Sequence, residues 1–301
     1  PRPTLVCHPL SHAVRRVRRA VAMILRRNHL LETLQDGRIA LGCSLNEARD
    51  PGMVYAMAAA GADTVFIDQE HNLHNTETVF DLVAHAHAAG ISPLVRPPQI
   101  DYAWITRLLD GGCQSLLIPH VRHPSEVERL IDLAFYHPRG RRGVALVGGA
   151  GVNYQEVTSA TDVMRWANEN LLVGLIIETP EAVEALDELL LPGIGLALVG
   201  HGDLAQLYGV PGDPRHRLVL EAQERVRALC AEREIAYGVF QPSPHLIASE
   251  VELGAQLIVH GGVFSFIRKS VGDFRRTVEG ALTADSRSAM VPPCGLPSVH
   301  R

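Results

Sequence analysis

The chain has 301 residues, of which 47% are hydrophobic and 20% are charged. This length suits one α/β barrel of roughly 250 residues with extensions at its ends, and the apolar fraction is ample for a large core. The net charge of −5, without a patch of aromatic and basic residues, argues against a nucleic-acid partner, and no apolar run reaches the ~18 residues of a membrane span. Five scattered cysteines without a C-x-x-C pair indicate neither a disulfide framework nor a thiolate zinc site, so we expect a cytoplasmic protein with a small-molecule partner.

The N-terminal segment is strongly basic. Its first 27 residues contain seven arginines, and no acidic residue precedes Glu32. This composition is that of an organelle transit peptide, but serine is sparse, and the alternative is a basic helix that is solvated or contacts another subunit. We expect residues 1–36 to form a basic extension with a helix, residues 37–282 to form the barrel, and the proline-rich residues 283–301 to form a flexible tail.

From residue 38 onward, short β-branched runs alternate with amphipathic stretches, which is the pattern of parallel βα units. Four glycine-ended helices are each followed by a buried strand, at AAGADTVFID, AAGISPLVR, DGGCQSLLIP and ELGAQLIVH. The pattern predicts eight strands at residues 39–44, 64–68, 92–96, 115–121, 172–177, 195–199, 236–240 and 257–259. It predicts helices at residues 75–89, 125–136, 181–190, 215–234, 245–253 and 263–282. We therefore predict a (β/α)8 barrel, with the glycine-rich insertion 140–170 as a lid or part of a binding site.

Ionisable residues follow most of the predicted strands. The second strand runs into Asp68, Gln69, Glu70 and His71, and polar groups end later strands at Arg96, His120, Glu178, His201, Asp203, Gln241 and His260. A polar residue after a strand is usually a turn or helix cap, so each one taken singly has that simpler interpretation. Their accumulation on one rim, where barrel enzymes place their chemistry, instead indicates an active site.

Glu178 and Asp203 end neighbouring strands, which lie roughly 4.8 Å apart, so their carboxylates can share one hard divalent cation. Two carboxylates with open positions suit Mg²⁺ or Mn²⁺, whereas Zn²⁺ would need His201 to turn inward. Arg96 has the planar fork that binds a carboxylate or enolate oxygen, unless it forms a structural ion pair. His71 can take a proton from a substrate or from water, unless it is an ordinary exposed loop histidine.

Ordered motifs give this chain a family resemblance from about residue 37 to residue 276. IDQEH, VRPP, LLDGG with LLIPHV, RGRRGV, IIETPEA and VGHGDL occur in the order and approximate spacing of the HpcH/HpaI-type metal-dependent pyruvate aldolases. The resemblance implies that Glu178 and Asp203 hold a divalent metal, with Mg²⁺ expected and Mn²⁺, Co²⁺ or Zn²⁺ as alternatives. It also implies that Arg96 binds the pyruvate or enolate oxygen, with Glu70 behind it.

The resemblance further implies that His71 pairs with Asp110 as an acid–base dyad. Backbone amides near Gly202 and Asp203 would receive the pyruvate carboxylate, so the expected partner is a 2-oxo acid such as pyruvate, oxaloacetate or a 4-hydroxy-2-oxo acid. This chain departs from the family's bacterial aldolases at Ile176, where they tend to carry glutamine, and at His201. At His120, which we expect to contact substrate, it resembles macrophomate synthase.

Three functions are compatible with these residues. The first is an aldolase that uses the enolate of pyruvate, and since the only lysine is Lys269, beyond the last strand, a Schiff-base aldolase is disfavoured. The second is an oxaloacetate decarboxylase or an enolate-adding synthase of secondary metabolism. The third is a non-catalytic barrel that serves in binding or assembly, and this one predicts that the carboxylate pair binds no cation.

Residues 263–282 predict an aromatic-rich amphipathic helix, with Phe264, Phe266 and Phe274 among its apolar positions. One packing surface needs less apolar area than this helix offers, which indicates a homo-oligomer. Barrels of the resembling family are hexamers that exchange a C-terminal helix between paired subunits. The alternative is that the helix covers the bottom of its own barrel.

Overall fold

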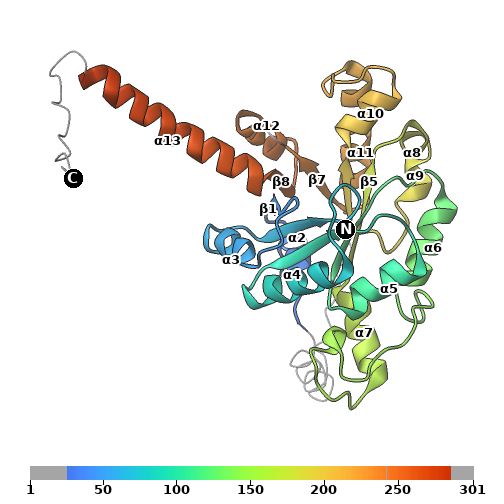
Figure 1. Cartoon of the computed structure of the whole chain (residues 1–301). Coiled ribbons are helices and arrows are strands. Elements are labelled where there is room, and N and C mark those ends of the chain that lie inside the picture. The colour runs from blue at the N-terminus through green and yellow to red at the C-terminus, as the bar shows by residue number, and fades with distance from the viewer. Residues whose placement is uncertain (1–25, 242, 286–301) are drawn as a thin grey trace, which may run out of the picture.

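The computed structural model describes residues 26–241 and 243–285, and its centre is a closed barrel of eight parallel strands in the order β1 to β8 (Figure 1). The strands are β1 (Ala40–Ser44), β2 (Thr64–Asp68), β3 (Ser92–Arg96), β4 (Ser115–Ile118), β5 (Leu172–Ile177), β6 (Leu196–Val199), β7 (Ala236–Phe240) and β8 (Leu257–Gly262). The prediction of a (β/α)8 barrel is confirmed. Most of these strands are apolar on both faces because one face fills the barrel and the other packs under helices.

Helices follow the strands around the outside. They are α3 (Gly52–Ala59), α4 (Thr76–Ala88), α5 (Tyr102–Asp110), α6 (Pro124–Ala134), α8 (Pro180–Glu184), α9 (Leu186–Leu189), α10 (His201–Leu207), α11 (Arg217–Glu232) and α12 (Ile247–Glu252), the last preceded by the 3-10 turn η2 (Pro244–Leu246). The helix predicted at 181–190 is therefore two short helices. The predicted fourth strand stops at Ile118, and the eighth runs on to Gly262.

A short helix closes the bottom of the barrel. α2 (His29–Gln35), which the sequence analysis assigned to the basic extension, buries Leu30 and Leu34 in the same interior cluster as Phe66 and Leu94. Asn28 caps α2, and its side-chain amide donates to the carbonyls of Gln114 and Asn170. The rest of the extension, residues 1–25, and the tail from 286 to 301 lie outside the described residues.

The insertion between β4 and β5 carries the 3-10 turn η1 (Ala150–Val152) and α7 (Ala160–Asn170). It lies at the end of the barrel opposite α10, so it does not cover the rim that carries the ionisable residues (Figure 1). The interpretation of the insertion as a lid over that rim is therefore wrong within one chain. No helix of the described residues is long and apolar enough to cross a membrane.

The last helix, α13 (Val263–Asp285), does not cover its own barrel. It extends outward from the end of β8 and stands clear of the other elements (Figure 1). A stripe of apolar side chains along it is exposed, formed by Phe264, Ile267, Val271, Phe274, Val278 and Leu282. The alternative that this helix packs on the bottom of its own barrel is therefore excluded in this conformation.

Candidate active site

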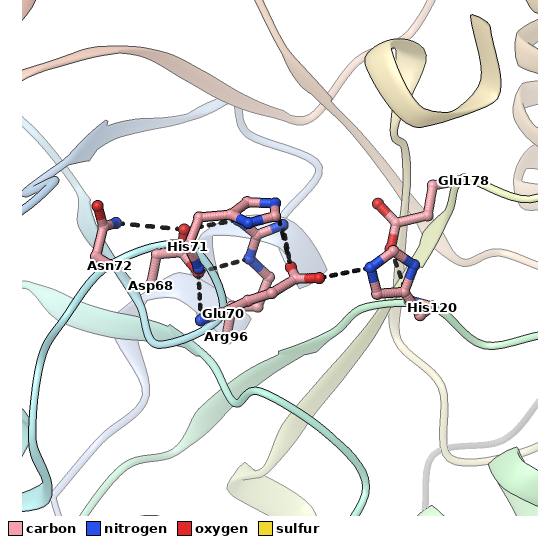
Figure 2. A network of polar contacts seen from close by, with 7 residues as sticks. All are labelled: Asp68, Glu70, His71, Asn72, Arg96, His120 and Glu178. Carbon is pink, nitrogen blue, oxygen red and sulfur yellow. Dashed lines mark hydrogen bonds and ion pairs between the residues drawn. The ribbon is translucent and has the colours of Figure 1, made fainter. Parts of the chain in front are cut away.

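The ionisable residues at the carboxyl ends of β2, β3, β4 and β5 form one network of polar contacts (Figure 2). The predicted rim residues Glu70, Arg96, His120 and Glu178 all belong to it, and Asp68 joins them. Parallel strands in register bring their ends to the same level, which explains how residues far apart in sequence meet here.

Arg96 is held by two carboxylates. The register of β2 and β3 pairs Arg96 with Asp68, and the guanidinium donates from Nε to Oδ1 at 2.8 Å and from Nη2 to Oδ2 at 2.6 Å. Its Nη1 lies 2.7 Å from Glu70 Oε2. Burial would raise the pKa of Asp68, but the hydrogen bonds and charge of Arg96 hold that pKa below its usual value.

Sequence reasoning placed Asp68 among the residues that end the strands at this rim, but it assigned the side chain no contact. Besides orienting Arg96, its Oδ1 accepts a hydrogen bond from the amide of Glu70 at 3.0 Å, and its Oδ2 accepts one from the side chain of Asn72 at 3.3 Å. Asp68 therefore shapes the loop after β2 as well as the guanidinium. The sequence held one signal for this ion pair, since an acidic residue ends one predicted strand and an arginine ends the next.

His120 lies between two carboxylates in a left-handed backbone conformation with φ of +54°, which is uncommon for a residue with a side chain. Its backbone amide donates to Glu178 Oε1 at 2.6 Å, and its ring Nε2 lies 2.6 Å from Glu70 Oε1. Its Nδ1 lies 3.5 Å from Glu178 Oε1 (Figure 2). This bridge places His120 inside the site, and its conformation could not be read from the sequence.

Glu178 is a buried carboxyl group whose side chain is 2% exposed. Burial raises its pKa to about 7, and the negative charges of Glu70 and Asp203 add to the shift. The close approach of β6 depends on Gly200, where a Cβ would lie 2.4 Å from Glu178 Cβ and 2.7 Å from its Oε2. A carboxylate buried among other carboxylates is the arrangement that a bound cation would stabilise.

Asp203 lies in the first turn of α10, directly after the exposed Gly202. No hydrogen bond or ion pair joins its carboxylate to another residue in the described part of the chain. Its negative charge acts on Glu178, and carboxylate oxygens of this kind are the ligands that hard divalent cations prefer. In residues 26–241 and 243–285, no group of three or more histidine, cysteine, aspartate or glutamate side chains is arranged to hold a metal ion.

His71 and Asp110 are not brought together within one chain. His71 lies beyond the end of β2 with its side chain 62% exposed, and its Nε2 is 3.8 Å from Glu70 Oε2. Asp110 ends α5, which runs back down the barrel, and it pairs with Arg142 at 2.8 Å on the side of the insertion. The predicted dyad is therefore not an intrachain pair, because His71 follows the carboxyl end of β2 whereas Asp110 ends α5 at the opposite end of the barrel.

Ile176 and His201, the positions at which this sequence departs from the bacterial aldolases, have different surroundings. Ile176 is 1% exposed in the barrel interior beneath Gly200, so an apolar side chain fills the place where the bacterial aldolases tend to carry glutamine. His201 does not turn inward to Glu178; its Nε2 lies 3.1 Å from the side chain of Gln223 on α11. A nitrogen-rich zinc site at this rim is therefore not formed by His201.

Comparison with known proteins decides the family. The model of the HpcH/HpaI aldolase/citrate lyase family matches residues 45–265, which is most of the barrel. The chain belongs to this family. It is therefore an enzyme of the aldolase/lyase type, and the resemblance seen in the sequence motifs is confirmed.

Relatives and solved structures of the family agree with this assignment. A 4-hydroxy-2-oxo-heptane-1,7-dioate aldolase of Salmonella paratyphi C is 32% identical over 236 residues, covering 78% of this chain and 88% of that protein. An HpcH/HpaI aldolase of Desulfitobacterium hafniense has a TM-score of 0.78 at 29% identity, covering 82% of this chain and 95% of that one. Macrophomate synthase, with a TM-score of 0.74 at 21% identity over 89% and 94% of the two chains, shares the fold.

Proposed function

We propose that this enzyme is a divalent-metal-dependent aldolase that cleaves or forms 4-hydroxy-2-oxo acids through the enolate of pyruvate. The observation that carries the proposal is the pair formed by buried Glu178 and unpaired Asp203, across the rim from a guanidinium held by Asp68. The relative that is a 4-hydroxy-2-oxo-heptane-1,7-dioate aldolase supports the substrate class.

Glu178 and Asp203 are the residues that would hold the metal ion, with Mg²⁺ expected and Mn²⁺, Co²⁺ or Zn²⁺ as alternatives. When bound, such an ion supplies Lewis acidity, which polarises the keto group and stabilises the negative charge of an enolate. Lys269, the only lysine, lies on α13 and pairs with Asp273, so it is remote from the rim and is no candidate for a Schiff base.

The other rim residues position the substrate and move protons. Arg96 binds the oxygen that becomes negatively charged, because Asp68 and Glu70 hold its guanidinium plane in one orientation. The amides of Gly202 and Asp203 receive the carboxylate of the 2-oxo acid. His71 is exposed beside Glu70 and takes the proton from the 4-hydroxyl group when the carbon–carbon bond breaks.

A second copy of the chain completes this proposal. Asp110 cannot reach His71 within one subunit, so a dyad between them requires Asp110 from a neighbouring subunit. The exposed apolar stripe of α13 offers a surface for such assembly, and we propose a homo-oligomer, with the hexamer of the family as the expected form.

One observation favours a second candidate reaction, the decarboxylation of oxaloacetate followed by addition of the enolate to an acceptor. His120 extends between Glu70 and Glu178 and is about half exposed, so it can contact a second carboxylate of the substrate. A 4-hydroxy-2-oxo acid with one carboxylate offers no partner for this contact, whereas a dioate offers one, so the contact favours oxaloacetate over the monocarboxylic hydroxy acids only.

The deciding experiment measures pyruvate release from a panel of 4-hydroxy-2-oxo acids and from oxaloacetate. Each substrate is assayed with chelator and then with Mg²⁺, Mn²⁺, Co²⁺ or Zn²⁺. The proposal expects metal-dependent cleavage of the hydroxy acids and its loss in Glu178→Gln. A preference for oxaloacetate would support the second candidate. If the protein shows neither turnover nor cation binding, the barrel is a binding or assembly protein.

A further inference from the structure

A buried network of amides and one carboxylate lies behind the rim, outside the residues of the proposed reaction. Glu250 on α12 accepts hydrogen bonds on both oxygens, from Gln223 Nε2 to Oε2 at 3.1 Å and from Gln241 Nε2 to Oε1 at 3.2 Å. Gln223 Nε2 also donates to the hydroxyl of Tyr237 at 2.9 Å, and Gln223 Oε1 lies 3.1 Å from His201 Nε2. Glu250 and its two glutamine partners are each at most 9% exposed.

The pattern fixes the direction of each hydrogen bond. An ionised carboxylate can only accept, so the Gln223 amide turns its nitrogen toward Glu250 and its carbonyl oxygen, which is an acceptor, toward His201. His201 must therefore carry its proton on Nε2 and donate it to Gln223. The chain of donors runs from His201 at the rim to the buried oxygen of Glu250.

Glu250 is an unusual residue in this place because no arginine, lysine or histidine pairs with it in the described part of the chain. A buried carboxylate with only neutral partners costs free energy relative to an apolar residue of the same size. The Glu250 carboxylate fixes the orientation of its neighbours in return, because its two oxygens bind two separate segments of the rim. One is the start of α10 through Gln223 and His201, and the other is the end of β7 through Gln241.

The start of α10 is the segment that matters for the proposed metal site. His201 is the first residue of α10 and lies two residues before Asp203, so the orientation of its ring and backbone limits where the Asp203 carboxylate can point. On the β7 side, Gln241 Oε1 accepts from the amide of Ser243 at 3.1 Å, and its backbone carbonyl contacts His260 Nδ1 at 2.7 Å. The network therefore joins the ends of β6, β7 and β8.

We infer that Glu250 is a positioning residue, which acts through Gln223 and His201 to hold the start of α10 and thereby the metal-binding geometry of Asp203. This inference rests on the proposed function, since it assumes that Asp203 holds a cation. It assigns to α11 and α12 a role in metal affinity that none of the rim residues reveals.

The test exchanges the acceptor and the donor within the network. Glu250→Gln keeps the size of the side chain but places an N–H donor against one of the two amides that now donate to Glu250. The double variant Glu250→Gln with Gln223→Glu restores the match. The carboxylate at position 223 accepts from His201, from the Tyr237 hydroxyl and from the new amide at position 250, whose carbonyl accepts from Gln241.

The readout is the dissociation constant of Mn²⁺, followed by electron paramagnetic resonance of the free ion in the full-length protein. We expect Glu250→Gln to weaken binding by up to about tenfold, the lower end of the effect of losing a direct partner of a metal ligand, because it acts through two intervening side chains. The double variant should recover most of that loss. Glu252→Gln, an exposed change on the same helix, is the matched control and should bind as the unmodified protein does.

Three outcomes contradict the inference. Unchanged Mn²⁺ affinity in Glu250→Gln would show that the network does not act on the site. If the double variant does not recover the lost Mn²⁺ affinity, the Glu250 carboxylate stabilises only the packing of α12 and does not position Asp203. If Glu250→Gln does not fold, His201→Asn carries the test at the half-buried end of the network, where unchanged affinity has the same meaning. Absence of Mn²⁺ binding in the unmodified protein would instead overturn the proposed function itself, and with it this inference.

Discussion

Arg96 is the side chain whose geometry is most tightly determined at this rim. Two of its five N–H donors bond to Asp68, and Nη1 lies 2.7 Å from Glu70 Oε2 without forming a hydrogen bond, which leaves the remaining donors for a substrate oxygen. A planar group held on two sides presents those donors at a fixed angle, whereas a lysine ammonium is a point charge on a flexible chain. Asp68 and Glu70 therefore fix the direction of the Arg96 donors as well as balance its charge.

Replacing Arg96 by lysine should lower kcat/KM by about 100-fold or more while metal binding is retained, because a misdirected donor loses the aligned contact with the reacting oxygen. Steady-state kinetics together with Mn²⁺ binding measure both effects. Arg141→Lys is the matched control, since Arg141 also binds a carboxylate, that of Asp132, but on the exposed surface. Near-normal turnover in Arg96→Lys would make Arg96 a structural ion pair.

Glu178 predicts a pH dependence for metal binding. Its pKa in the folded protein is about 7, raised from 4.5 by burial, so between these values the folded protein holds a proton that the unfolded chain has released. Stability therefore falls as pH rises through this window, and ionised Glu178 destabilises the metal-free protein above it. A cation that binds the carboxylate must displace this proton below pH 7.

We expect calorimetric titration with Mg²⁺ or Mn²⁺, repeated in buffers of different ionisation enthalpy, to detect release of about one proton per metal ion near pH 6 and little release above pH 8. The Glu178→Gln variant serves as the control and should show no such difference. Equal proton release at both pH values would mean that Glu178 is not the group that the cation contacts.

At the scale of elements, the approach of β5 to the turn after β6 depends on one small residue. A side chain at Gly200 would press on Glu178, as the 2.4 Å and 2.7 Å distances from its Cβ position show. Gly202, two residues later, has no atom within 4 Å of its Cβ position. Alanine at Gly200 crowds Glu178 and also restricts the backbone, whereas alanine at Gly202 only restricts the backbone, so comparing the two variants separates the two effects.

Gly200→Ala should destabilise the protein by about 1–3 kcal/mol, as overpacking of a filled site does, and should weaken metal binding by displacing Glu178. Gly202→Ala should leave the free energy of unfolding close to that of the unmodified protein. Chemical denaturation and Mn²⁺ titration of the pair measure the contrast. If both variants were equally stable, the turn after β6 would have room that the structure does not show.

At the scale of the whole molecule, α13 is the helix whose apolar side chains remain exposed in a single chain. Its apolar stripe has no packing partner in its own barrel, and several of its large side chains are more than half exposed, with Val271 at 61%, Phe274 at 69% and Leu282 at 66%. Exposed apolar area of this extent usually marks a contact with another protein surface.

Light scattering at micromolar concentration should give a mass several times the 32.8 kDa of one chain. Phe274→Asp should shift the assembly toward smaller species, because it places a charge in the centre of the stripe. Thr277→Asp adds the same charge to an exposed position off the stripe and should leave the mass unchanged. A mass near 33 kDa for the unmodified protein would refute the oligomer.

Strand positions and the identity of the rim residues could be predicted from the sequence. Buried parallel strands are continuous apolar runs, so β2, β3, β5 and β7 begin and end where those runs do. The predicted strand ends were wrong at β4, which stops before Pro119 and does not reach Val121, and at β8, which continues past the polar His260. The two short helices α8 and α9 were merged because their apolar spacing continues across the break.

Only the tertiary structure decided how the rim residues contact one another. The pairing of Asp68 with Arg96 depends on strand register, the bridge through His120 depends on one left-handed residue, and the network around Glu250 depends on where α12 docks. Local sequence determines which residues reach the ends of strands, because burial and periodicity act over a few neighbours. Contacts between residues tens of positions apart depend on the closure of the barrel and the path of its loops, and no local pattern encodes either.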